Sequence, residues 1–142
     1  MRHFLWVVLI ALGAFAAWWV LQKPSHKRPW ADDVAQLLHA EINGDKVVLE
    51  NVRNFEWRTE IDYTARWETR RYDLSTLQSA DLVLSYWMGP AIAHTLVSFG
   101  FSDGRYLTFS LEIRKEKGEE FSAWKGFFRQ YEAILVAADE AD

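Results

Sequence analysis

An uninterrupted apolar run near the N-terminus constrains this chain more than any other feature of its sequence. Residues 4–21 carry no charged or strongly polar side chain, and Lys23-Pro24 follows shortly after them. As a helix with a rise of 1.5 Å per residue, the run extends over about 27 Å, close to the ~30 Å hydrocarbon core of a bilayer. The sequence therefore predicts one transmembrane helix within residues 1–22, which contacts membrane lipid through residues 4–21.

A cleaved signal peptide is the alternative interpretation of the same run. Arg2 then serves as the basic n-region, residues 4–13 as the apolar h-region, and Ala14-Phe15-Ala16 as the small-x-small cleavage site. Cleavage there leaves Trp18 and Trp19 exposed near a new terminus, whereas both rings suit the interface of a retained anchor. The anchor is favoured, and both interpretations stay open.

The distribution of charge bears on orientation and on partners. The chain has 16 Lys and Arg against 20 Asp and Glu, and most of the basic residues near the apolar run lie in the linker segment 23–29. By the positive-inside rule, this basic excess favours a cytoplasmic domain. The rest of the chain is acidic, and acidic surfaces repel nucleic acid at long range. We therefore expect no nucleic-acid partner.

Residues 30–142 have the pattern of one α+β domain with a mostly antiparallel sheet. Short alternating runs separated by turn residues predict the strands, and Asn43-Gly44 is the strongest of the turn signals. Short helices are expected over 30–38 and 122–130, with Ser122 as the N-cap of the second. The expected strands are a hairpin within 40–57, a strand over 81–87 that Met88-Gly89-Pro90 ends, a hairpin over 94–114, and a final strand over 131–138.

Arginines and aromatic rings alternate within residues 53–73, a composition also found where single-stranded nucleic acid binds. Acidic residues are interleaved with these arginines, so the segment carries little net charge. We therefore expect cross-strand ion pairs on a solvated sheet face, with the tryptophans mainly in the core. A role of these rings in stacking against sugars stays open.

The alternation of two consecutive strands places one histidine beside one glutamate. Apolar and polar side chains alternate in residues 105–114, and residues 94–101 follow the same pattern. Ser102-Asp103-Gly104 predicts a three-residue loop with glycine in the left-handed position. Counting back along both strands from this loop puts His94 opposite Glu112, at a Cβ separation of about 5 Å.

A carboxylate beside an imidazole fixes its tautomer and raises its basicity, as a general base requires. His94 and Glu112 are therefore the candidate catalytic residues, and a purely structural His–Glu pair is the alternative. His39 and Glu41 share a strand face at metal-like spacing, but two ligands do not make a zinc site. The chain has no cysteine, which excludes disulfides and thiolate zinc sites. We expect no metal and no cofactor.

Three segments of the chain carry a family resemblance: Asn51-Val52-Arg53-Asn54-Phe55, Tyr86-Trp87-Met88-Gly89-Pro90-Ala91-Ile92-Ala93-His94-Thr95, and Phe109-Ser110-Leu111-Glu112-Ile113-Arg114-Lys115-Glu116. They resemble the Lnb N-terminal periplasmic domain family, which is named after a bacterial lipoprotein N-acyltransferase. The resemblance runs from about Trp30 to the last residue. Its His94-Thr95 and Glu112-Ile113-Arg114-Lys115 motifs are fairly specific.

This resemblance implies a permuted papain-like fold of the NlpC type, in which a histidine strand precedes a cysteine helix. His94 matches the histidine expected to activate the thiol, and Glu112 is the group expected to orient it. In the family, an Asn-Cys-Thr segment past the equivalent of Asp142 supplies the nucleophile. The resemblance thus implies an incomplete, C-terminally truncated domain over residues 30–142, which is inactive alone as a thiol acyltransferase or hydrolase.

The resemblance also implies a single-pass protein of the inner membrane whose domain faces the periplasm, against the charge argument. Its partner would be a lipoprotein or another envelope component. The alternative function is a non-catalytic binding module that holds an envelope component with its Trp- and Arg-rich strands. Because the apolar strand around 134–136 comes last, we expect an exposed edge strand or apolar face, marginal stability and self-association.

Overall fold

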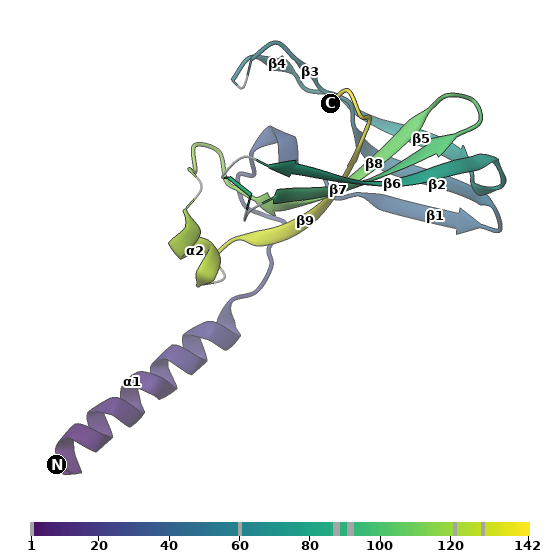
Figure 1. The fold of residues 1–142 in the computed structure, drawn as a ribbon. Coiled ribbons are helices and arrows are strands. Elements are labelled where there is room, and N and C mark those ends of the chain that lie inside the picture. Colours follow the sequence, from purple (N-terminus) through teal and green to yellow (C-terminus); the bar gives the residue numbers. More distant parts are fainter. Residues whose placement is uncertain (1, 60, 87–88, 91–92, 121, 129) are drawn as a thin grey trace.

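The computed structural model describes residues 2–142 with the exception of 60, 87–88, 91–92, 121 and 129 (Figure 1). Within this part of the chain, an N-terminal helix precedes a domain built on a seven-stranded sheet. The helical elements are α1 (Arg2–Leu21), η1 (Asp32–Val34), η2 (Leu74–Thr76) and α2 (Ala123–Phe127), where η denotes a 3-10 turn. The strands are β1 (His39–Asn43), β2 (Lys46–Arg53), β3 (Glu56–Trp57), β4 (Tyr63–Thr64), β5 (Trp67–Asp73), β6 (Leu77–Tyr86), β7 (Ala93–Phe101), β8 (Tyr106–Arg114) and β9 (Glu132–Ala138).

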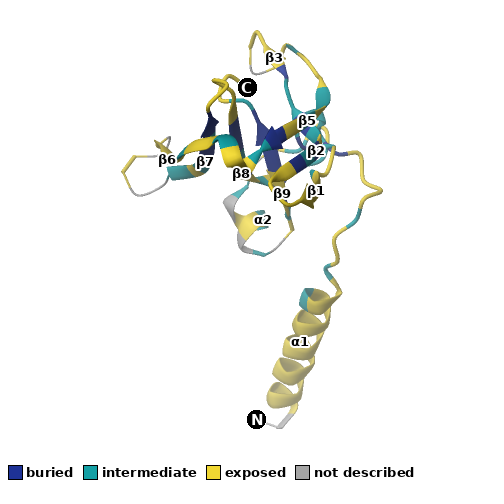
Figure 2. Cartoon of the chain, turned by 90° about the vertical axis from the view of Figure 1, so that its right-hand side faces the viewer, coloured by how far each residue is buried: buried dark blue, intermediate teal, exposed yellow. Residues whose placement is uncertain are grey.

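Helix α1 forms where the apolar run predicts it, and its side chains are almost all exposed (Figure 2). A core helix of a globular protein buries its apolar stripe, whereas the span His3–Leu21 has none of its most apolar window buried. The helix therefore has the length and composition to cross a membrane. Residues 22–29 then lead to the domain without helix or strand, and the Ser25 N–H donates to Glu132 Oε1 at 2.7 Å.

The main sheet is mixed but mostly antiparallel, as predicted. Its strands follow the order β1-β2-β9-β8-β7-β6, and β5 joins by pairing with β2. The parallel contact is a single residue pair, Arg53 with Ala138, between β2 and β9. Strands β3 and β4 form a separate two-stranded sheet. The observed fold is therefore α+β, with an apolar N-terminal helix and short helical turns.

The final strand lies inside the strand order rather than at its end, contrary to the prediction, although it pairs with β2 only at Ala138. β9 lies between β8 and β2, and Ile134 and Val136 are buried. Its pairing with β2 joins segments far apart in the sequence, which the order of strands along the chain does not indicate. The ends of the strand order are β1 and β6 instead.

The turn of the first hairpin lies one residue later than Asn43-Gly44. Asn43 is the last residue of β1, and Gly44-Asp45 form the loop, with Gly44 at φ +57°. Glycine takes this positive φ without the strain that a Cβ atom imposes, so it occupies the first loop position. The loop 102–104 between β7 and β8 forms as predicted, with Gly104 at φ +81°.

The predicted helix over 30–38 is reduced to the single turn η1. The guanidinium of Arg114 donates to the carbonyl oxygens of Val34 and Ala35 at 3.0 and 2.8 Å. A longer helix requires these carbonyls for its own backbone bonds. The second predicted helix is present but short, and Ser122 accepts from the Lys125 N–H as its N-cap.

Strand β6 begins at Leu77, before the predicted start at residue 81, and follows the prediction from there to Tyr86. The predicted last strand residue, Trp87, and Met88 of the predicted break lie outside the described residues.

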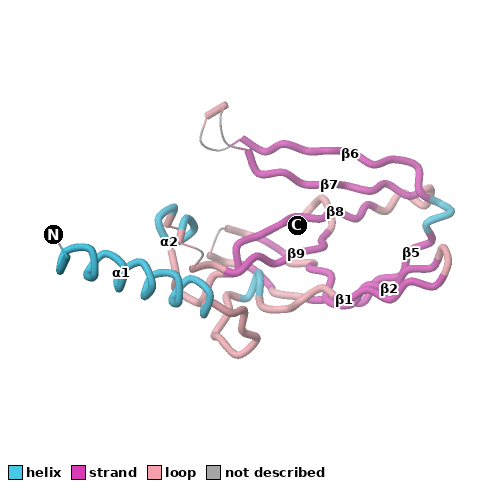
Figure 3. The backbone as a smooth tube through the Cα atoms, turned by 90° about the horizontal axis from the view of Figure 1, so that it is seen from below, coloured by secondary structure: helices cyan, strands magenta, loops and turns pink. Residues whose placement is uncertain are grey.

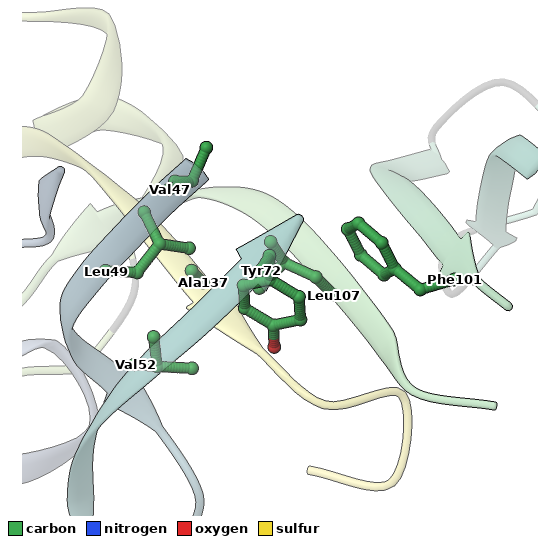
Figure 4. Close-up of a cluster of buried hydrophobic side chains, with 7 residues drawn as sticks. All are labelled: Val47, Leu49, Val52, Tyr72, Phe101, Leu107 and Ala137. Carbon is green, nitrogen blue, oxygen red and sulfur yellow. The ribbon is translucent and has the colours of Figure 1, made fainter. Parts of the chain in front are cut away.

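The main core forms where β2 and β5 pack against one face of β7, β8 and β9 (Figure 4). Figure 3 shows the β6–β7 hairpin on one side of β8 and β9, with β1, β2 and β5 on the other. A smaller cluster, Val34 with Ile134 and Val136, covers part of the opposite face of β9. That opposite face remains partly open beside the cluster. The main core consists of Val47, Leu49, Val52, Tyr72, Phe101, Leu107 and Ala137.

Candidate functional site

His94 and Glu112 lie side by side on neighbouring strands, as the predicted register requires. β7 pairs with β8 with Leu96 opposite Ser110, and continuing this antiparallel register leads to His94 and Glu112. Nε2 of His94 is 3.1 Å from Oε1 of Glu112 and 2.6 Å from Oγ of Ser110. The Ser110 hydroxyl in turn donates to Glu112 Oε1 at 2.5 Å. An imidazole nitrogen, a hydroxyl and a carboxylate oxygen therefore meet at one point.

Counting donors and acceptors places the hydrogen atoms of this cluster. A carboxylate only accepts, so the single hydroxyl hydrogen of Ser110 is directed to Glu112. The Ser110 oxygen can then only accept from His94, which places a hydrogen on Nε2. In the neutral ring, Nδ1 keeps the lone pair, and no hydrogen bond reaches it from the described residues. Nδ1 is therefore the basic atom of the cluster.

The cluster lies in a cavity of about 610 Å³ on the open face of the sheet, here called the cleft. The side chains of His94 and Glu112 are 33% and 30% exposed, so a ligand can reach both. Val83, Leu96 and Val136 form apolar parts of its lining. Apart from Ala138, the other lining residues are polar or charged, among them Arg53, Asp139 and Asp142.

A second polar cluster occupies another part of the cleft. The buried hydroxyl of Ser98 accepts from Thr108 Oγ1 at 3.2 Å and donates to Glu140 Oε1 at 2.5 Å. The two glutamates of the cleft, Glu112 and Glu140, thus both accept hydrogen bonds from serine hydroxyls. These bonds satisfy polar groups that burial would otherwise leave unpaired.

Of the residues in the two polar clusters of the cleft, the sequence predicted His94 and Glu112 and not Ser98, Thr108, Ser110 and Glu140. The two serines lie on the same strand faces as His94 and Glu112, so the alternation of side chains contained a signal for them. Glu140 follows β9 in an irregular segment, where no periodic pattern predicts its position.

Arginines of residues 53–73 form ion pairs, as predicted, but the pairs do not join neighbouring strands of the sheet. Arg58 contacts Asp62 at 2.6 Å, and Glu68 contacts both Arg66 and Arg70 at 3.0 and 3.2 Å. The Asn54 amide, and then the Arg70 guanidinium, hold the pKa of Glu68 below its ordinary value.

Two tryptophans of this segment do not lie in the main core, which corrects the prediction for them. Trp57 and Trp67 pack against Phe55 instead, in a separate ring cluster.

His39 and Glu41, the second pair considered from the sequence, do not form a metal site with a third ligand among the described residues. His39 and Glu41 lie exposed on β1, opposite Glu50 and Val48 of β2. Among the described residues, no three His, Asp or Glu side chains gather as metal ligands.

Fold and cleft together define an α+β domain that follows an apolar helix and holds a histidine against a carboxylate. The family model of the Lnb N-terminal periplasmic domain matches residues 63–142, more than half of the chain. The chain belongs to this family. No curated protein and no solved structure matches it.

The family match includes both His94 and Glu112. It begins at residue 63 rather than near Trp30, so β1, β2 and β3 lie outside it. Membership makes the domain periplasmic, opposite to the side that the basic flank favours. Helix α1 is accordingly an anchor or a signal sequence.

Proposed function

We propose that the cleft is the base-bearing part of a thiol-dependent acyl-transfer or hydrolysis site. The observation that carries this proposal is the contact of His94 Nε2 with both Ser110 and Glu112, which leaves Nδ1 as the base. Residues 1–142 hold no cysteine. The proposal therefore assigns them the base and the cleft, assigns the sulfur to a group outside them, and expects them to be inactive by themselves.

In the proposed step, Nδ1 of His94 takes the proton of the thiol while the sulfur attacks the carbonyl carbon of an ester or thioester. The ring becomes an imidazolium and keeps its Nε2–H directed to Ser110 and Glu112. The carboxylate charge stabilises this cation. The tetrahedral intermediate then expels its alcohol or thiol, which takes the proton from Nδ1, and the acyl group stays on the sulfur.

Ser110 is not the nucleophile in this proposal. A serine nucleophile gives its hydrogen to histidine, with the carboxylate on the other ring nitrogen. Here the Ser110 hydroxyl donates to Glu112, and both groups face Nε2 of His94. The serine hydroxyl therefore acts with Glu112 to hold the ring.

An exchange reaction tests the base without the missing sulfur. The full chain in phospholipid vesicles is mixed with a palmitoyl thioester, with and without added N-acetylcysteine as the thiol. We expect no acyl turnover without the thiol, and exchange faster than in empty vesicles when the thiol is present. His94→Gln removes the acceleration, and Glu112→Gln lowers it about tenfold because the ring loses its orientation.

The matched control is His39→Gln, which changes an exposed histidine on β1 and leaves the exchange rate unchanged. Turnover without thiol contradicts the expected inactivity. Equal exchange rates for the wild type and His94→Gln contradict the assignment of the base.

We further propose that α1 stays attached as a single-pass anchor in the inner membrane, in contact with lipid through residues 4–21. Phe15, Trp18 and Trp19 support this, because their rings pack together near the domain end of the helix, where an interfacial aromatic belt is expected. The substrate is then an acyl-bearing lipoprotein or another envelope component at the membrane surface. Intact mass of the protein from washed membranes tests this, since loss of residues 1–16 contradicts a retained anchor.

A further inference from the structure

The β3–β4 hairpin stands apart from the main sheet (Figure 1). A cluster of aromatic rings packs on it. Its two strands are very short, and an isolated hairpin of this kind is at best marginally stable. Four rings hold it together, with centroids of the contacting pairs 4.7–5.6 Å apart. These rings belong to Phe55, Trp57, Tyr63 and Trp67.

A cavity of about 400 Å³ lies between this hairpin, η1 and the segment that follows β8. Trp57, Ile61 and Tyr63 form its apolar wall, and Asp32 and Lys117 are among its polar residues. Trp57 is 37% exposed and Ile61 is 92% exposed, so both offer apolar surface to a ligand. The cavity shares none of its lining residues with the cleft.

Each charged side chain that lines this cavity contacts an opposite charge within the described residues. The Lys117 ammonium lowers the pKa of Asp32, and both groups are charged at neutral pH. An ionic ligand thus meets no unmatched charge, whereas hydroxyl groups can bond to paired carboxylates and ammoniums without separating them. The pairs are Lys117–Asp32, Lys115–Asp33, Arg28–Glu116 and Lys125–Glu119, at 2.7, 3.3, 3.5 and 2.9 Å.

The aromatic wall is fixed before any ligand arrives. The carboxylate of Asp142, 1% exposed, accepts from Trp57 Nε1 at 2.9 Å, from the Phe55 N–H at 2.8 Å and from Arg53 Nε at 2.9 Å. Figure 1 shows the C-terminal residues beside the hairpin. A side chain that is already immobilised loses little further freedom on binding, which favours affinity.

We propose that this cavity binds a neutral oligosaccharide. The C–H face of a sugar ring packs against the indole of Trp57 and the phenol of Tyr63, and its hydroxyl groups bond to Asp32 and Lys117. This binding needs no chemistry from His94, and it stands whether or not the cleft is catalytic.

The Trp57 indole N–H signal of the ¹⁵N-labelled full chain reports binding. We would titrate triacetylchitotriose and maltotriose into the protein in phosphocholine micelles, which carry no sugar head groups. At least one sugar is expected to shift this signal saturably. Trp57→Ala, followed through the Tyr63 amide signal, weakens binding about tenfold, because the main stacking surface is lost.

Ile61→Ala is the second variant, because this exposed side chain can be shortened without unfolding the domain. It is expected to weaken binding several-fold. The matched control is Trp124→Ala, which removes a tryptophan 74% exposed on α2 and leaves the affinity unchanged. His94→Gln also leaves it unchanged, which separates this site from the cleft.

Three outcomes overturn the proposal. The first is no saturable shift with either sugar at about 10 mM, a weak limit for a specific site. The second is wild-type affinity in both Trp57→Ala and Ile61→Ala. The third is an equal response to the neutral peptide penta-alanine, which assigns the cavity to peptides.

Discussion

At the scale of single residues, the tautomer of His94 determines which of its nitrogens can act as a base. The donor count predicts that neutral His94 carries its hydrogen on Nε2, because Ser110 and Glu112 both face that atom. The ¹⁵N shifts of the ring, read from long-range ¹H–¹⁵N spectra above neutral pH, distinguish the two tautomers. We expect Glu112→Gln and Ser110→Ala to mix the tautomers, and a wild-type ring protonated on Nδ1 contradicts the assigned base.

Asp73 makes the folded state sensitive to acid. The Lys46 ammonium, and then the Ser75 hydroxyl, lower the pKa of Asp73 from its ordinary 3.8 to about 2. A carboxyl whose pKa is lower in the folded state stabilises the fold above its unfolded pKa, and this stabilisation is lost as the pH falls through the folded pKa.

We therefore expect Asp73→Asn to be less stable than the wild type at pH 6 in urea unfolding. The difference narrows between about pH 4 and pH 2 and disappears below that range. Glu50→Gln, an exposed change on β2, serves as the control for replacing a surface carboxylate by an amide. A difference that stays constant from pH 6 to pH 2 contradicts the role of Asp73.

The sequence contained enough information for the histidine and glutamate of the cleft and not for the rest of its lining. His94 and Glu112 follow from strand alternation and one loop length, which are local properties. Ser110 could have been found by the same argument, since it lies on the face of Glu112. Glu140 could not, because its contact with Ser98 joins an irregular segment to a distant strand.

At the scale of elements, Arg114 joins the segment around η1 to β8. Its buried guanidinium donates to the carbonyls of Val34 and Ala35 and lies over the Trp30 ring, 4.4 Å from the centroid. Burial lowers the pKa of this guanidinium. One side chain therefore satisfies two carbonyl groups and packs against an indole.

Arg114→Met is expected to lower the free energy of unfolding by about 2–4 kcal/mol, because the two carbonyls lose their charged donor. Urea unfolding followed by circular dichroism measures this loss. Arg71→Met, at an exposed position on β5, is the matched control and changes stability little. An equal loss in both variants contradicts the role given to Arg114.

The elements differ in how well the sequence predicts them. The β7–β8 hairpin depends on neighbours in sequence, and its strands and loop form as predicted. The helix over 30–38 fails because Arg114, distant in sequence, takes its carbonyls. The edge position predicted for β9 also fails because of a contact between distant parts of the sequence. Its partner there is β2, which lies far from it along the chain.

At the scale of the whole molecule, a large apolar part of the sheet faces solvent. Register places Leu111 beside Leu135, and alternation puts Leu82 of β6 on the same face. Leu111 is 65% exposed, and the other two are exposed as well. Apolar patches of this kind favour association, so of the two predicted sources of self-association we favour the apolar face over the strand edge.

Replacing Leu111 and Leu135 by threonine is expected to weaken self-association several-fold with little change in stability, since both side chains are exposed. Sedimentation velocity in phosphocholine micelles, over a range of protein concentrations, measures it. Leu12→Thr, an exposed change within α1, controls for association through the helix. Unchanged association in the double variant contradicts the role of this face.

The short segment 22–29 limits how far the domain can move from α1. Even fully extended it reaches no more than about 28 Å, and the Ser25 bond to Glu132 shortens this reach further. If α1 stays in the bilayer, the domain is tethered and stays within a thin layer next to the membrane surface. The rate at which the domain meets a substrate then depends on the number of substrate molecules per area of membrane. Substrates held at that surface are therefore favoured over freely diffusing ones.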